Sequence, residues 1–454
     1  MFRDRLLKAA SIVLLGVSIV ICSGCAVFSS NSFLRAAETS KSAFSTGVPT
    51  EEIQMNNECT EFTSGYSYVD FSDMDTELIF AQEQNGSLLG QPGYCYQTLS
   101  EDEQALYEEI YKALMTFESE CVLRTTDSDQ VKKVYNHVIA DHPEIFWTEG
   151  YTLNTTKRGN KIISLDFSMH QTMSCEQIAD WQSVIRAWIE EFTAVAKEAG
   201  IYSGSSDYEI IKFTFDYIVR NTEYQTNSEN NQNICSVFGS GYSVCQGYSV
   251  AMQYMLLYQG IQSVTVAGVT KENQTSHAWN LVKADGDWYY LDVTWGDPSF
   301  TESNEMLQDV VNYSYFCVTE EEISHTHLVD DRLTLPECTA TKDNYFVQEG
   351  CYFEDWDEDR FQELMAACIE EGKRYISIRM KDQTLYEEIR KELIDDQKIF
   401  SCIDKGSAQA GVSQVFRLSY FENKIKRFIN YKTSIIIFVV QGVFLGLTEF
   451  VINV

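Results

Sequence analysis

The sequence predicts an α+β fold, and three observations lead to this prediction. The chain of 454 residues is long enough for two or three domains with a sizeable core. Residues 100–200 combine helical spacing of apolar residues with strand-like alternation. The stretch from Gly239 to Pro298 then places a helical pattern before two alternating runs, which are joined by an Asp-Gly turn. We expect the rest of the chain to carry, anchor or cover this stretch.

The composition argues against nucleic acid as a partner. The formal net charge is −33 at pH 7. Proteins that bind nucleic acid neutralise phosphates with Lys and Arg, which is the opposite charge balance. The acidity is typical of a solvated surface that keeps a secreted protein soluble.

Residues 1–25 are typical of an export signal. Basic residues stand at the start, and the apolar run from Ala9 to Ile21 is too short for a comfortable membrane span. The small residues before Cys25 resemble a bacterial lipoprotein cleavage site, although such sites usually carry an aliphatic residue where this chain has Cys22. Lipidation at Cys25, ordinary cleavage and an uncleaved anchor all stay open. Each of them predicts export to the extracellular face of the cell membrane.

Two regions are predicted between the signal and the central stretch. Residues 26–98 are expected to form a flexible tether, because Ser, Thr, Glu and Asn are frequent and no apolar period is sustained in the first part. Residues 99–200 are expected to form an N-terminal α+β domain. Ser100 with Glu103 is a capping box that starts one helix, and Ser174 with Gln177 starts a longer one.

Residues 201–345 are predicted to be a catalytic domain, with Cys245 at the start of its central helix. The apolar spacing predicts a helix that begins at Ser243 or Val244 and runs to Leu257. Unpaired N–H groups and the positive end of the helix dipole stabilise a thiolate in a first turn. A cysteine taken alone is more often a small buried hydrophobic residue, so further residues are needed for a functional interpretation.

A predicted hairpin supplies those residues. The two alternating runs place His277 on one strand and Asp292 on the next, with Asp285-Gly286 as the turn between them. A two-residue loop pairs Ala284 with Asp287, and this register makes Asp292 a same-face diagonal neighbour of His277, whereas a register slip of two would make the two residues directly opposite. An aspartate beside a histidine fixes its tautomer, and the histidine can activate a thiol. Cys245, His277 and Asp292 are therefore the candidate nucleophile, base and orienting residue.

At these residues the sequence resembles the transglutaminase-like core of bacterial cell-surface proteins, a family related to papain-like cysteine proteases. The resemblance implies a papain-like transglutaminase core, in which a Cys-bearing helix packs on an antiparallel sheet that carries His and Asp. It also implies thioester chemistry on an amide, with transfer to an amine or to water. The matching segments are Cys245-Gln246-Gly247-Tyr248, Gly260-Ile261, Ala267-Gly268-Val269, His277-Ala278-Trp279-Asn280 and the run from Trp288 to Pro298.

The resemblance leaves the oxyanion hole open. A papain-type Gln six residues before the nucleophile is absent, since this position is Gly239. The backbone N–H of Cys245 is the expected first donor, and the segment Ser240–Ser243 is a candidate source of the second. Trp279 and its neighbouring tryptophans are as compatible with core packing as with substrate walls.

No metal or other cofactor is expected. The pair His325 and His327 lies near Asp330, and alternate histidines could share one face of a strand. The pair lacks the three or four ligands that zinc sites use. A zinc hydrolase built on this pair therefore remains a third-ranked alternative.

The chain end contains two further predicted regions. Residues 346–410 are expected to form a small α/β appendage without a catalytic constellation. Residues 411–454 begin with basic residues and end in an apolar run, Ser434 to Val454, that is long enough to span a bilayer. Glu449 would be costly inside a bilayer, and the basic flank would prefer the cytoplasmic side although the export signal places the preceding domain outside. A weak membrane anchor and an abnormal chain end therefore both stay open.

These observations predict an exported cysteine enzyme that cleaves or transfers a peptide or protein amide through a Cys thioester. Its expected partners are a peptide or protein substrate at the cell envelope and the membrane that anchors it. The alternative is a non-catalytic surface module that binds peptides or proteins with the same fold.

Overall fold

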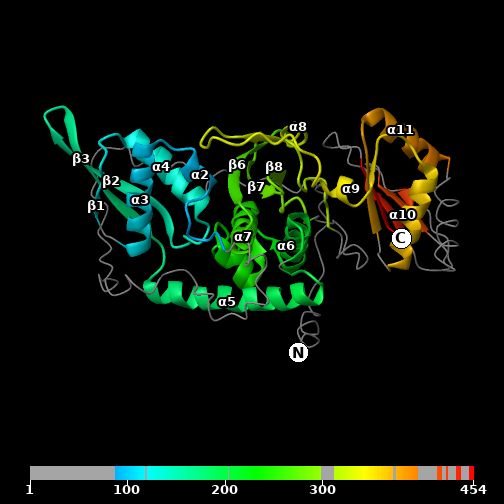
Figure 1. Cartoon of the computed structure of the whole chain (residues 1–454), viewed down its shortest axis with the longest axis horizontal. Helices are drawn as coiled ribbons and strands as arrows, with labels where there is room; N and C mark the ends of the chain where they lie inside the picture. Colours follow the sequence, from blue (N-terminus) through cyan, green and yellow to red (C-terminus); the bar gives the residue numbers. More distant parts are fainter. Residues whose placement is uncertain are drawn as a thin grey trace, which may run out of the picture.

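A computed structural model of the chain describes residues 87–117, 120–202, 204–297, 311–371 and 375–396, together with the backbone of four short strands between 417 and 453. The predicted export signal with Cys25, and most of the predicted tether, lie outside the described residues. Figure 1 shows the chain extended along one axis, with the N-terminal helices and strands at one end, α6 and α7 in the middle, and α10 and α11 at the other end.

The N-terminal part packs helices on a small antiparallel sheet. The strand order is β1-β3-β2, and the long β2–β3 hairpin is its largest feature. The predicted capping box of Ser100 and Glu103 is present at the start of α3. Its elements are α2 (Tyr94–Gln97), α3 (Glu101–Thr116), β1 (Cys121–Val122), α4 (Ser128–Asp141), β2 (Thr148–Arg158) and β3 (Lys161–Gln171).

The structure corrects the predicted end of the tether. Leu89, Cys95 and Leu99 are buried, and Cys95 lies in the short helix α2. The carboxylate of Asp141 accepts hydrogen bonds from the backbone N–H groups of Cys95 at 2.9 Å and Tyr96 at 2.8 Å. Residues 87–98 therefore belong to the folded part, since a buried carboxylate at the end of α4 holds them there.

The long helix α5 (Cys175–Glu198) joins the N-terminal part to the centre. It starts at the predicted capping box of Ser174 and Gln177. In Figure 1 it runs below both parts. Trp188 of α5 packs against Phe238, with ring centroids 4.6 Å apart, and Trp181 lies against Gly239. One continuous hydrophobic core extends from Leu89 to Cys317 and includes residues of both parts.

The central part packs α7 (Cys245–Tyr258) against a four-stranded antiparallel sheet of order β8-β7-β6-β9. α7 is apolar on nearly all sides and is buried along most of its length, as expected for a helix enclosed by other elements. The other elements are α6 (Asp207–Asn221), β4 (Glu223–Tyr224), a π-helical turn (Ser236–Ser240), β5 (Tyr242–Ser243), β6 (Ser263–Thr270), β7 (Ser276–Ala284), β8 (Asp287–Leu291), α8 (Glu320–Ile323) and β9 (His327–Val329).

The predicted hairpin register is confirmed. Ala284 pairs with Asp287 and Asn280 pairs with Leu291, so the loop contains only Asp285 and Gly286. Both loop residues have positive φ, 49° and 96°, which matches the backbone twist that a two-residue hairpin requires. The transglutaminase-like α+β architecture predicted for this part, with a Cys-bearing helix on an antiparallel sheet, is present.

The described residues of 344–371 and 375–396 are called the C-terminal unit below. It has its own small hydrophobic core, which includes Phe346, Phe361 and Ile378. The end of the predicted appendage, residues 397–410, lies outside the described residues. The elements are α9 (Tyr345–Gln348), β10 (Tyr352–Phe353), α10 (Glu358–Glu370), β11 (Tyr375–Met380), α11 (Gln383–Arg390) and a π-helical turn (Lys391–Asp395).

Four strands follow, and one of them pairs with the C-terminal unit. β15 (Glu449–Asn453) is antiparallel to β11, so these residues of the predicted apolar tail lie in a strand. The others are β12 (Arg417–Phe421), β13 (Lys426–Arg427) and β14 (Ile436–Val440). Within the part of the chain that the structure describes, we find no helix with both the length and the apolarity needed to cross a membrane.

Candidate active site

Cys245 lies in the first turn of α7, as predicted, but it is the first residue of the helix, one or two positions after the predicted start. The preceding residue, Val244, has an extended backbone with φ −118° and ψ 178°, so the helix begins abruptly at the cysteine. The thiol is free and partly exposed. Because the first N–H groups of a helix have no intrahelical acceptor, they and the helix dipole favour a negative sulfur at this position.

Gly247 explains how the chain folds tightly around this helix start. A Cβ atom at this position would lie 2.0 Å from Ser243 Oγ and 2.8 Å from the carbonyl oxygen of Asn231. Ser243 Oγ in turn lies 2.7 Å from Ser236 Oγ. The absence of a side chain at Gly247 thus lets the preceding segment press against the first turn and hold Cys245 in place.

His277 and Asp292 meet on the sheet. His277 Nε2 lies 2.7 Å from Asp292 Oδ2, and only 2% of the histidine and 0% of the aspartate are exposed. His277 is on β7, and Asp292 follows directly after the end of β8. The hairpin therefore brings together the two residues that the sequence predicted to be neighbours.

Charge and hydrogen bonding set the protonation of this pair. Burial disfavours the imidazolium, but the charge and hydrogen bond of Asp292, and then a hydrogen bond with Cys245, raise the pKa of His277 well above its usual value. Burial also opposes the carboxylate, but His277 and a second histidine, His327, lower the pKa of Asp292. Because Nε2 of His277 bonds Asp292, Nδ1 is the ring nitrogen that remains for the thiol.

The second histidine is a residue whose place in the site the sequence did not predict. His327 Nε2 lies 3.1 Å from the same Oδ2 of Asp292, and its Nδ1 lies 2.7 Å from Thr326 Oγ1. Burial is the largest cause that lowers the pKa of His327, and the charge of His277 acts in the same direction. His327 thus favours the neutral form, which donates one N–H to Asp292 and accepts from Thr326.

Asp292 is held on its other oxygen as well. The backbone N–H of Trp295 donates to Oδ1 at 3.0 Å, and the backbone N–H of Asp292 donates to Tyr315 at 3.0 Å. Three donors therefore surround a fully buried carboxylate, which compensates for the loss of its hydration.

Aromatic rings enclose the two histidines. Trp279 is fully buried, and its ring centroid lies 5.8 Å from that of His277 and 4.7 Å from that of His327. Trp295 lies 5.5 Å from His277 and 4.5 Å from His327. These rings exclude water from the His–Asp pair, and the burial of Trp279 favours the core-packing interpretation of this residue.

The predicted oxyanion donors receive different support. The backbone N–H of Cys245 belongs to the first turn of α7, where the helix offers it no acceptor. The hydroxyls of Ser240 and Ser243 make local hydrogen bonds instead, to Ser236. For either hydroxyl to act as the second oxyanion donor, its hydrogen bond to Ser236 would have to break.

The structure does not support the zinc site that was considered as an alternative for His325 and His327. His325 is exposed in the turn before β9 and bonds the backbone oxygen of Glu322, whereas His327 is buried beside Asp292. His277, Asp292 and His327 do lie close enough to hold a metal ion, with ligand atoms within 4.8 Å of one another. Both Nε2 atoms lie at hydrogen-bond distances from one oxygen, so we interpret the group as a hydrogen-bonded network.

Comparisons with known proteins agree with this arrangement. The family model described as the transglutaminase-like superfamily matches residues 194–293. The kyphoscoliosis peptidase of Mus musculus is 22% identical over 200 residues, which cover 40% of this chain and 30% of the relative. The kyphoscoliosis peptidase of Homo sapiens is 26% identical over 98 residues, which cover 19% of this chain and 15% of the relative.

A similarity to solved structures is also found. The chain in the crystal structure of a TGase is 17% identical, the match covers 35% of this chain and 46% of that chain, and the TM-score is 0.23.

This chain spans less than a third of the length of the two kyphoscoliosis peptidases. The family match contains Cys245, His277 and Asp292, and the chain therefore carries a core of the transglutaminase-like superfamily at residues 194–293.

Proposed function

We propose that the chain is an exported cysteine enzyme that cleaves or transfers a peptide or protein amide. The observation that carries the proposal is the geometry of three residues. Cys245 stands at a helix start and interacts with His277, whose Nε2 lies 2.7 Å from Asp292. This arrangement supports a thiolate–imidazolium pair that is oriented by a buried carboxylate.

The first half of the reaction forms an acyl-enzyme. The Cys245 thiolate attacks the amide carbon, a C–S bond forms, and the carbonyl electrons move to oxygen. The backbone N–H of Cys245 is placed to stabilise that oxyanion. When the intermediate collapses, the C–N bond breaks and the leaving amine takes a proton from the His277 imidazolium. The product is a thioester on Cys245.

The second half of the reaction decides between hydrolysis and transfer. Neutral His277 accepts a proton from water or from an amine as it attacks the thioester, and the thiolate leaves. Water gives a free acid and an amine gives a new amide. The two curated relatives are named peptidases, which supports hydrolysis as one outcome, while the catalytic residues alone are compatible with both.

One experiment separates these outcomes. The chain lacking residues 1–25 is incubated with a glutamine-containing peptide library and a labelled primary amine, and products are read by mass spectrometry. Incorporation of the amine supports transfer, and free acid alone supports hydrolysis. Cys245→Ala should abolish both, whereas the neighbouring change Gln246→Ala should leave product formation within about twofold of the unmodified chain.

The same experiment tests the non-catalytic alternative. If neither product forms and iodoacetamide modifies Cys245 no faster than it modifies the buried thiol of Cys235, the enzyme proposal fails. Peptide binding that persists in Cys245→Ala would then favour a surface-binding module.

Export and anchoring form a separate part of the proposal. They rest on the charged start and the apolar run of residues 1–25, with Cys25 as the candidate lipidated residue. Labelling of cells with an alkyne fatty acid should mark the intact chain and not Cys25→Ala. Labelling of neither, together with release of the chain into the medium, would favour ordinary cleavage.

A further inference from the structure

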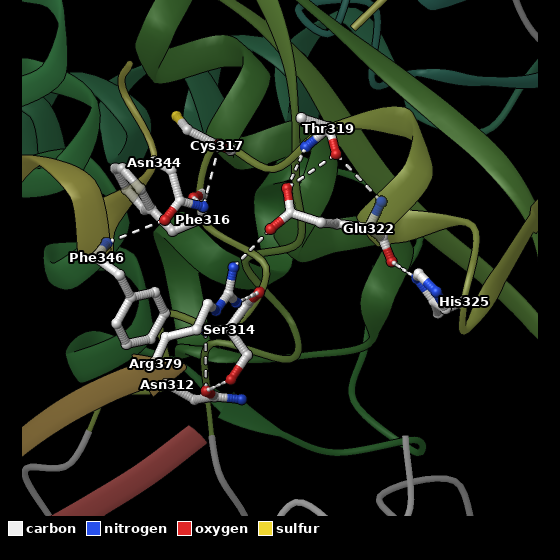
Figure 2. Close-up of polar contacts among 10 residues, drawn as sticks. All are labelled: Asn312, Ser314, Phe316, Cys317, Thr319, Glu322, His325, Asn344, Phe346 and Arg379. Carbon is white, nitrogen blue, oxygen red and sulfur yellow. Dashed lines mark hydrogen bonds and ion pairs between the residues drawn. The ribbon is translucent and has the colours of Figure 1, made fainter. Parts of the chain in front are cut away.

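One buried arginine is among the contacts between the C-terminal unit and the central part, alongside the stacked rings of Tyr345 and Tyr313 and the hydrogen bond from Tyr208 to Glu349. Arg379, on β11, is only 6% exposed. Figure 2 shows its guanidinium between two segments of the central part: Nη1 donates to Glu322 Oε1 at 2.8 Å, and Nη2 donates to the backbone oxygen of Ser314 at 2.6 Å. The guanidinium also lies 4.4 Å from the ring centroid of Phe346. Arginine is rarely buried to this degree unless it is paired.

The first contact leads to His327. The second oxygen of Glu322 accepts from the N–H and the hydroxyl of Thr319, at 2.8 and 2.9 Å, and so completes the capping box of α8. A single helical turn is not stable alone, so α8 depends on such contacts. After α8, the backbone N–H of Thr326 donates to the carbonyl oxygen of Ile323 at 3.1 Å. Strand β9 begins at the next residue, His327.

The second contact leads to the backbone of Asp292. Ser314 is also fixed by Asn312, whose Oδ1 accepts from its N–H at 3.1 Å and its hydroxyl at 2.6 Å. The next residue, Tyr315, accepts the backbone N–H of Asp292 at 3.0 Å. The Arg379 guanidinium therefore bonds two segments of the central part. The Ser314 segment contacts the main chain of Asp292, and the Glu322 segment leads into His327, the second histidine that bonds the Asp292 carboxylate.

We propose that Arg379 is a positioning residue for the active site: it clamps the Ser314 and Glu322 segments together and thereby seats His327 and Asp292 against His277. This inference rests on the proposed function for its effect on reactivity, but the position of His327 can be measured without any activity. It assigns the C-terminal unit a role in the catalytic part, where the sequence predicted only an appendage. A lysine would reproduce the clamp only in part, because its donors all lie on one nitrogen and it lacks the planar fork of two separated N–H groups.

The test compares four variants of the full chain, of which Arg379→Lys keeps the positive charge but not the planar fork. Arg379→Met removes the fork, and Glu322→Gln removes the ion pair but keeps a side chain that can complete the capping box. Lys381→Met is the matched control, since Lys381 is a cation of the same unit whose ion pair with Asp355 is exposed. Iodoacetamide modification of Cys245 is followed between pH 5 and 9 by peptide mass spectrometry, and the imidazole ¹⁵N signals of the six histidines are recorded by selective labelling.

We expect Arg379→Met and Glu322→Gln to slow modification of Cys245 at least fivefold at pH 7, change its pH profile and move the His327 imidazole signals. Arg379→Lys should restore part of the rate, and Lys381→Met should match the unmodified chain. The proposal is overturned if Glu322→Gln, folded as judged by its melting temperature, keeps both the unmodified rate and the His327 signals. If Cys245 of the unmodified chain is unreactive, the proposed function fails, and the His327 signals still decide the positioning role: displaced signals support it and unchanged signals refute it.

Discussion

His327 Nε2 lies 3.1 Å from Oδ2 of Asp292, although the two residues are 35 positions apart in the chain. The histidine adds an N–H donor to a carboxylate that already accepts from His277 and Trp295. A buried carboxylate with several donors keeps its charge and its orientation. The site is thus better described as a Cys–His–Asp group with a second histidine behind the aspartate.

The first prediction concerns this second histidine. His327→Ala removes a buried donor and leaves a cavity, so we expect a loss of about 2–4 kcal/mol in the free energy of unfolding and slower iodoacetamide modification of Cys245. His327→Gln, which retains an N–H donor, should recover part of both. Denaturant unfolding and peptide mass spectrometry measure the two effects.

The neighbouring histidine provides the control for this prediction. Within the described residues, His325 is exposed and its ring bonds the backbone oxygen of Glu322 in its own turn, so His325→Ala should change stability by less than about 0.5 kcal/mol. Equal effects of the two substitutions would contradict the role given to His327.

The second prediction concerns the pKa of His277. Asp292→Asn removes the negative charge that raises this pKa, and the burial that lowers it remains. The bond with Cys245, which also raises the pKa, remains as well, so we expect the titration midpoint of His277, followed by imidazole NMR, to fall substantially toward the usual value of about 6.5. A midpoint that stays raised in Asp292→Asn would mean that another group holds the charge.

The same substitution has a pH-dependent effect on stability. The raised pKa of His277 gives stability that is complete below its unfolded pKa of about 6.5 and is lost as the pH rises through the folded value. The lowered pKa of Asp292 gives stability that is complete above its unfolded pKa of about 3.9 and is lost as the pH falls through the folded value. The difference in unfolding free energy between the natural chain and Asp292→Asn should be largest between these limits and shrink on both sides.

Much of the fold near the site could be predicted because its determinants are local. The Asp285-Gly286 turn and the alternation on either side set the hairpin register, and the capping box at Ser174 set the start of α5. Cys245 was placed correctly in the first turn of its helix for the same reason. Neighbouring residues carry all of this information.

The features that could not be predicted depend on contacts between distant segments. β9 pairs with β6 across more than fifty residues, and this pairing carries His327 to Asp292. His325 and His327 alternate in the sequence, but β9 begins only at His327, so the two do not share a strand face. Residues 87–98 lack a local apolar period and are held by distant groups: the Asp141 carboxylate accepts the N–H groups of Cys95 and Tyr96, and Leu257 accepts that of Leu88. The only local signal for His327 was its position before Leu328 and Val329 in an otherwise acidic and polar segment.

The third prediction concerns Gly247. Gly247→Ala would place a methyl group 2.0 Å from Ser243 Oγ and 2.8 Å from the Asn231 carbonyl, so the first turn of α7 or the preceding segment must shift. We expect a loss of about 1–3 kcal/mol in unfolding free energy and slower modification of Cys245. Gln246→Ala, one position earlier, is the control and should change neither by much. A stable and fully reactive Gly247→Ala would show that the segment is not fixed by close packing.

The fourth prediction concerns Asp297, whose carboxylate accepts from the Tyr248 hydroxyl at 2.6 Å. Burial raises the pKa of Asp297 to about 6, and the charge of Glu223 adds to this, although the Tyr248 bond opposes it. A carboxyl group with a raised folded pKa binds its proton more tightly in the native state, so stability is lost as the pH rises from about 4 to 6. Asp297→Asn keeps an acceptor for Tyr248 and removes the charge. It should therefore raise the unfolding free energy at pH 7 by roughly 1–3 kcal/mol and have little effect at pH 4.

Tyr248→Phe at the same two pH values is the control: it removes the hydrogen bond that favours the carboxylate, so it should destabilise the chain more at pH 7 than at pH 4. Equal effects of Asp297→Asn at both pH values would show that the cost lies in packing and not in the charge.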